Sequence, residues 1–144
     1  MPTHAEKRPL PYSPEQLCEL VADVARYPEF LPWCVGARVR SADEHLIVAD
    51  LVIGYKVFRE RFTSRVILHK PKRIDVEYRD GPFRYLNNHW IFERNEDGST
   101  TIDFYVDFEF RSRLMQKMIG VVFNEAVRRM VRAFEQRAHD LYGD

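Results

Sequence analysis

One carboxylate in the sequence stands among large apolar residues and is the strongest candidate for acid–base chemistry. Glu60 lies two residues after Phe58 and two before Phe62, so in a strand the three side chains share one face. An apolar surrounding hydrates a carboxylate poorly and favours the protonated form that a general acid needs. The commoner arrangement is a glutamate near a strand end that pairs with Arg59, Arg61 or a neighbouring strand, and both interpretations stay open.

The other reactive residue types show no spacing typical of a catalytic or metal site. The two cysteines, Cys18 and Cys34, are sixteen residues apart, and no HExxH, GxSxG, GxGxxG or GxxxxGK[ST] motif occurs. We therefore predict no catalytic residue, no metal site and no cofactor, and a protein that is not an enzyme. The five histidines are scattered, at His4, His45, His69, His89 and His139.

Aromatic side chains are the more prominent functional signal in the sequence. The chain has ten Phe, seven Tyr and two Trp, and strand alternation with helical spacing directs many of them towards one interior. A filled core and a cavity for a hydrophobic ligand both fit this pattern. The candidate pocket-lining residues are Phe30, Trp33, Phe58, Phe62, Tyr78, Trp90, Phe92, Phe104, Val106, Phe108, Met118, Val122 and Met130.

The N-terminal region before the main sheet is predicted to contain a strand, a helix and a further short helix or turn. Alternation over residues 2–10 predicts a first strand. Ser13, Pro14 and Gln16 then form the start signal of a helix over about 14–25, with an N-cap, a first-turn proline and a capping box. Two prolines and three aromatic residues within 27–34 predict a second short helix or a turn.

From residue 35 to residue 110 the apolar period is two, which predicts about six strands. The clearest strand is 101–110, and others are expected over 57–68, 73–79 and 86–94. Breaks fall near 41–44, 54–56, 71–72, 81–82 and 95–99. Connections this short join antiparallel neighbours, so we expect a meander with one buried face.

A long helix closes the chain. Ser112 is a suitable N-cap and Gly143 a suitable stop, which gives a helix of roughly 45 Å if it is unbroken. Gly120 predicts a bend or two abutting helices. Its apolar stripe needs the apolar face of the sheet as a partner, and we place in it Met115, Met118, Val122, Ala126, Met130, Phe134, Ala138 and Leu141.

Chain length, composition and charge balance limit the class of protein. At 144 residues with 45% hydrophobic content the chain is expected to form one domain. The 22 basic residues balance 22 acidic ones, which argues against nonspecific binding of DNA or RNA by the whole protein. Few cysteines, a polar start and the lack of a spanning segment predict a cytoplasmic protein, with peripheral contact at the inner face of the membrane left open.

Four stretches carry a family resemblance along the whole chain. In order and spacing they resemble blocks of the START-like superfamily, and within its polyketide cyclase/dehydrase group the branch of coenzyme Q-binding proteins and ribosome association toxins. The stretches are PYSPEQLCELVADVARYPEFLPWC at 11–34, FRERFTSRV at 58–66, DGPFRYLNNHW at 80–90 and VFNEAVRRMVRAFEQRAHDLYG at 122–143.

The resemblance implies an α+β helix-grip fold over residues 1–144, a single START-like lipid-binding domain. A curved antiparallel sheet of six to seven strands would wrap the C-terminal helix, with two short helices after the first strand and a cavity between the layers. It further implies a non-catalytic carrier or chaperone of ubiquinone or a related polyprenyl lipid, supporting respiration or quinone synthesis. A quinone ring would stack on Trp90, Tyr78 or a Phe, and its carbonyls would need a donor such as Asn88, Tyr105 or an Arg. The alternatives are a ribosome-associated toxin-like protein and an aromatase/cyclase-like enzyme.

Charge is uneven along the chain. Residues 111–137 hold seven Lys or Arg against two Glu, a net +5. This pattern is typical of a solvated helix face, and it also suits contact with an anionic membrane or with ribosomal RNA. Arg128, Arg129 and Arg132 are the candidate surface for either partner.

Overall fold

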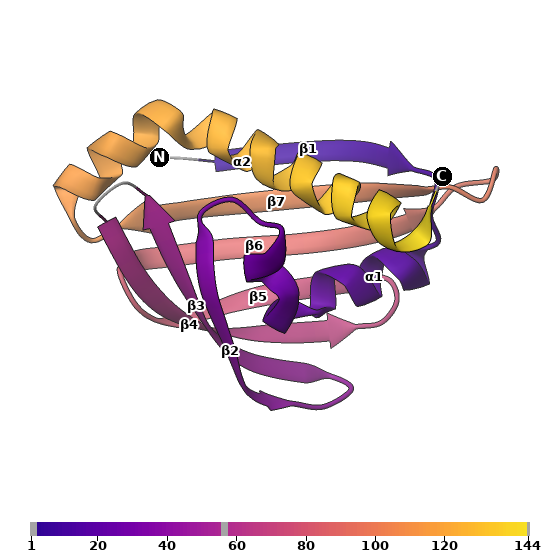
Figure 1. Ribbon diagram of the computed structural model, residues 1–144, viewed down its shortest axis with the longest axis horizontal. Helices are drawn as coiled ribbons and strands as arrows, with labels where there is room; N and C mark the ends of the chain where they lie inside the picture. Colours follow the sequence, from indigo (N-terminus) through magenta and orange to yellow (C-terminus); the bar gives the residue numbers. More distant parts are fainter. Residues whose placement is uncertain (1–2, 56–57, 144) are drawn as a thin grey trace.

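A single antiparallel sheet of seven strands forms the body of the protein. The computed structural model describes residues 3–55 and 58–143, and within them the strand order is β1-β7-β6-β5-β4-β3-β2. The predicted α+β helix-grip fold is confirmed, since the curved sheet lies against one long terminal helix (Figure 1). The strands are β1 (Thr3–Leu10), β2 (Cys34–Ala42), β3 (Leu46–Tyr55), β4 (Phe58–His69), β5 (Arg73–Asp80), β6 (Phe83–Arg94) and β7 (Thr100–Phe110).

The first helix, α1 (Pro14–Ala22), begins as its sequence predicts and ends earlier. The Ser13 hydroxyl accepts from the Gln16 amide at 3.1 Å, and the Gln16 side chain accepts from the Ser13 amide at 3.0 Å. At Asp23 the backbone N–H donates to the carbonyl of Leu20 at 3.3 Å, a bond that tightens the chain. The predicted helix over 14–25 is therefore divided into α1 and the 3-10 helix η1 (Val24–Glu29).

The turn between β5 and β6 requires a glycine, and an irregularity in the strand pairing follows it. Between β5 and β6 Gly81 adopts φ 145°, and a Cβ there would lie 2.5 Å from the Cβ of Phe62. Only glycine fits that turn without displacing the neighbouring strand. The register of β6 shifts against β7 between Phe83 and Tyr85, so Phe83 and Leu86 both reach the interior despite their odd spacing.

The terminal helix, α2 (Arg113–Tyr142), is continuous through Gly120. The Ser112 hydroxyl accepts from the Met115 amide at 3.2 Å, and Gly143 ends the helix at φ 82°. Figure 1 shows the helix changing direction within its N-terminal third, drawn in orange, while it runs along the sheet.

The fully buried row of α2 shares Met115, Phe134 and Ala138 with the predicted stripe and differs from it elsewhere. Leu141, which we place in the stripe, is 52% exposed. Two adjacent rows of the helix are apolar, and the predicted row contains Met118, Val122, Ala126 and Met130, which are only half-buried. The buried row consists of Met115, Phe123, Val127, Val131, Phe134 and Ala138.

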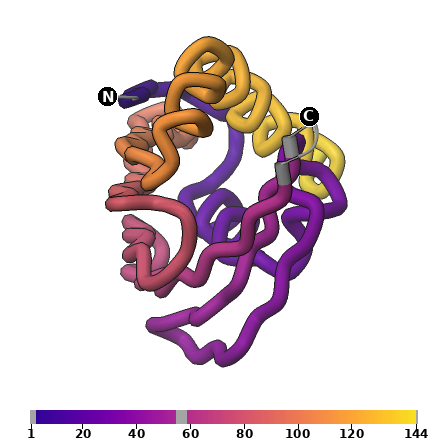
Figure 2. The backbone as a smooth tube through the Cα atoms, turned by 90° about the vertical axis from the view of Figure 1, so that its left-hand side faces the viewer, coloured from indigo at the N-terminus to yellow at the C-terminus, as the bar shows by residue number. Residues whose placement is uncertain are grey.

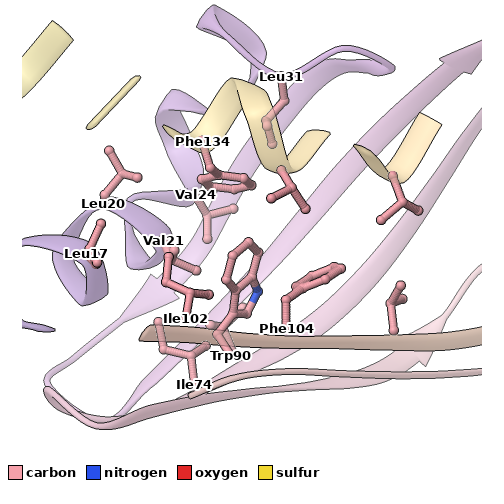
Figure 3. Packing of buried hydrophobic residues seen from close by; sticks show 14 of the residues in the cluster. Leu17, Leu20, Val21, Val24, Leu31, Ile74, Trp90, Ile102, Phe104 and Phe134 are labelled. Atoms are coloured by element: carbon pink, nitrogen blue, oxygen red, sulfur yellow. The ribbon is translucent and has the colours of Figure 1, made fainter. Parts of the chain in front are cut away.

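Both ends of the interior are filled. Near α1, Trp90 lies 4.6 Å from Phe104 and 4.9 Å from Phe134 between ring centres, beside the α1 and η1 residues Leu17, Leu20, Val21 and Val24 (Figure 3). At the other end of β6, Phe83 stacks on Phe110 at 4.7 Å. The backbone trace in Figure 2, seen from one end of the molecule, shows α2 above the curved sheet.

Candidate ligand-binding site

A cavity of about 290 Å³ lies between the two filled ends. Strands β3 to β7 form one wall, α2 forms another, and the segment from η1 to Cys34 completes it. An engineered cavity of about 150 Å³ is large enough to bind benzene. The space therefore suits a ring with the first carbons of a chain.

Most of the predicted lining residues lie on this wall. Phe30, Tyr78 and Phe92 do not, so their predicted place at the cavity needs correction. The side chain of Phe58 falls outside the described part of the structure. The predicted residues on the wall are Trp33, Phe62, Trp90, Phe104, Val106, Phe108, Met118, Val122 and Met130.

The three displaced residues pack against protein instead. Phe30 contacts Phe134 edge to face at 5.3 Å, and the guanidinium carbon of Arg137 lies 5.0 Å from its ring centre. Tyr78 accepts a hydrogen bond from the Phe83 amide at 3.1 Å. Phe92 shares a face of β6 with Trp90 and is equally buried, but only Trp90 lines the cavity. Strand alternation indicates the face of a residue, and it does not show where along the strand the core ends.

Sequence reasoning missed several wall residues on β3. Leu51 and Ile53 line the cavity. The strand reads LIVADLVIGY, in which apolar residues occupy both odd and even positions. A strand without clean alternation does not reveal its inner face, because both faces carry apolar side chains.

Trp33 is held on the wall by an unusual backbone. Its φ is 70°, in the left-handed region that a bulky residue rarely adopts. Its carbonyl accepts from the Gly54 amide at 2.8 Å, which ties the segment to the end of β3. Such a conformation persists only where surrounding contacts impose it, and here it places an indole at the cavity.

Few polar side chains reach the cavity. Asn88 lines it and donates from Nδ2 to the carbonyl of Tyr105 at 2.8 Å. Glu60 and Ser64 lie on the inner face of β4. The predicted ion pair of Glu60 with Arg59 or Arg61 is not formed, and within residues 3–55 and 58–143 its carboxylate has no hydrogen bond or ion pair.

The other ionisable groups of the wall are kept neutral. Burial raises the pKa of the Tyr27 hydroxyl far above its usual value, and the hydroxyl donates to the carbonyl of Val21. Burial also raises the pKa of the Cys34 thiol, the opposite of the shift that prepares a nucleophile. Neither group is set up for covalent or acid–base chemistry near neutral pH.

Among residues 3–55 and 58–143, no three His, Cys, Asp or Glu side chains gather where a metal ion could be held. No helix in the same residues has the length and apolar character required to cross a bilayer.

Comparisons with known proteins agree with this geometry. A model of the family described as polyketide cyclase/dehydrase and lipid transport matches residues 10–135. The ribosome association toxin RatA of Pseudomonas aeruginosa is 37% identical, over 99% of this chain and 100% of its own. The mitochondrial coenzyme Q-binding protein COQ10 homolog B of Xenopus laevis is 35% identical, over 97% of this chain and 59% of its own.

A solved structure supports the fold alone. The Zhui aromatase/cyclase of a Streptomyces species superposes with a TM-score of 0.82 at 15% identity, over 96% of this chain and 93% of that one. At that identity the shared arrangement of sheet and helix says nothing about a shared reaction.

Proposed function

The chain belongs to the polyketide cyclase/dehydrase and lipid transport family, and on that premise we propose that it carries ubiquinone or a related polyprenyl lipid without chemical change. The cavity between α2 and the sheet is the observation that carries this proposal. Its role would be to present the lipid to enzymes of respiration or quinone synthesis. The name of the Xenopus relative points to the same class of ligand.

Apolar burial alone supplies enough affinity for such a ligand. Each buried CH₂ contributes about 0.8 kcal/mol, so one fully buried five-carbon isoprene unit contributes about 4 kcal/mol. Two units would offset much of the cost of association. Directional contacts are needed only at the head of the ligand, which agrees with the few polar side chains on the wall.

A carrier must exchange its lipid at a membrane, and the start of α2 has a suitable surface. Leu114 is 63% exposed and Val121 85% exposed. Arg113 and Lys117 accompany them, and residues 111–124 contain no Asp or Glu. Each basic residue near an anionic bilayer contributes about 1 kcal/mol. The same helical turns face the cavity through Met118, which supports peripheral contact of a cytoplasmic protein with the inner face of a membrane.

The direct test of this function is the content of the purified protein. We expect organic extraction followed by mass spectrometry to find an isoprenoid or quinone lipid in substoichiometric to equimolar amount, because the apolar cavity retains such a lipid. A heat-denatured and washed sample of the same preparation is the control. Several preparations without quinone, isoprenoid or acyl lipid above background would contradict the carrier role.

A second candidate function is contact with the ribosome, which the names of several relatives favour. Arg128, Arg129 and Arg132 are exposed on α2, outside the cavity wall. Glu125 pairs with Arg129 at 3.2 Å and with Arg132 at 3.4 Å, which leaves Arg128 as the arginine of this surface without an acidic partner in the described residues.

For this candidate we expect the protein to sediment with a ribosomal subunit, and a charge reversal to weaken that binding. The change is Arg128→Glu, and the binding is expected to fall severalfold and to decline as salt rises. Arg38→Glu, at an exposed arginine on β2, is the matched control. If both variants sediment with the subunit to the same extent as the unchanged protein, this surface is not the one that binds the ribosome.

A further inference from the structure

Glu60 brings a carboxylate to an otherwise apolar part of the cavity. It shares the inner face of β4 with Phe62 and Val66, and all three line the cavity. Across the ladder it lies opposite Ile53, another wall residue. Arg59 and Arg61, its neighbours in sequence, are exposed on the other face of the strand.

Glu60 and Asn88 both bring hydrogen-bond acceptors to the cavity wall. The carboxylate oxygens of Glu60 can accept from a donor on the ligand. The Nδ2 of Asn88 donates one hydrogen bond to the carbonyl of Tyr105 and keeps a second N–H, and its Oδ1 can accept a hydrogen bond. The hydroxyl of Tyr27 donates to the carbonyl of Val21.

We propose that the cavity selects a ligand with a hydroxyl on its head, and that Glu60 is the acceptor for that hydroxyl. This rests on the carrier function proposed above. For a quinone carrier, the preferred cargo is the reduced quinol rather than the quinone. A quinol hydroxyl donates to the carboxylate, whereas a quinone carbonyl only accepts.

The size of the preference for quinol over quinone follows from the cost of leaving the Glu60 carboxylate without a hydrogen-bond donor. A quinone carbonyl placed against the carboxylate removes water from it and returns no hydrogen bond. A hydroxyl in the same place returns a hydrogen bond to the carboxylate. We expect the quinol to bind about tenfold more tightly than the quinone.

The experiment is isothermal titration calorimetry with decylubiquinol and decylubiquinone under anaerobic conditions. These two probes have the same tail and differ only at the head. Each is titrated into the unchanged protein, into Glu60→Gln and into Glu93→Gln. Glu93 is an exposed carboxylate on β6 and serves as the matched control. Thermal unfolding of all three proteins shows whether each is folded.

The expected result is a quinol preference of about tenfold in the unchanged protein and in Glu93→Gln, reduced to about twofold or less in Glu60→Gln. An amide both donates and accepts, so it suits either head. Equal affinities in the unchanged protein, or an undiminished preference in a folded Glu60→Gln, would overturn this inference and leave the carrier function standing. Binding of neither probe to the unchanged protein would overturn the carrier function as well.

Discussion

Ala126→Phe is expected to raise the Kd for decylubiquinol at least about a hundredfold while the protein stays folded. Ala126 lies on α2 and lines the cavity. A phenyl ring at this position enters the space of about 290 Å³ that the head of the ligand would occupy. It also gains contacts with wall atoms that lack neighbours on that side, so the melting temperature should stay the same or rise.

Asn124→Phe is the matched control, because it places the same ring on the exposed side of the same helix. Calorimetry measures the Kd of both variants, and circular dichroism follows their thermal unfolding. We expect Asn124→Phe to bind like the unchanged protein. A Kd for Ala126→Phe within threefold of that value would show that the ligand does not enter this cavity.

Phe134→Ala is expected to lower the free energy of unfolding by about 3–5 kcal/mol. Its ring is 4% exposed and contacts three others edge to face, namely Tyr27 at 5.4 Å, Phe30 at 5.3 Å and Trp90 at 4.9 Å. These contacts join α2 to η1 and to the sheet. Truncation leaves a void that the surrounding elements can fill only by moving together.

Met130→Ala compares a half-buried wall residue with Phe134, which also lines the cavity but is buried in the aromatic cluster. Met130 lies one turn earlier on α2, is half-buried and lines the cavity. Part of its surface has no packing partner, so we expect a loss of about 1 kcal/mol or less. Urea unfolding measures both variants. A loss below about 1 kcal/mol for Phe134→Ala would show that the aromatic cluster does not anchor α2.

The elements that the sequence predicted well are those with local causes. The capping box of Ser13 and Gln16 is formed, and Ser112 caps α2. Strand β7 alternates between buried and half-buried residues along its whole length, as its period of two predicts. These signals depend on side chains a few residues apart, so no knowledge of the rest of the fold is needed to interpret them.

The sequence predicted the end of the first helix and the buried row of α2 poorly. Both depend on residues that are distant in the chain. The helix expected over 14–25 stops at Ala22, because the chain tightens into η1 there. On α2, Phe123 and Val127 are buried where we expected Met118 and Val122 to be. Both rows are apolar, and only the position of the helix on the sheet decides which row is covered.

By itself the sequence determined the order of the elements, the antiparallel sheet, the terminal helix and, through its resemblance to a family, the class of fold. The tertiary structure alone decided that a hollow remains, that Phe30, Tyr78 and Phe92 pack outside it, and that Leu51 and Ile53 line it. A cavity is the volume left where two layers fail to meet. Its place depends on the curvature of the sheet and on the size of side chains that face each other from opposite layers, and neither is a property of adjacent residues.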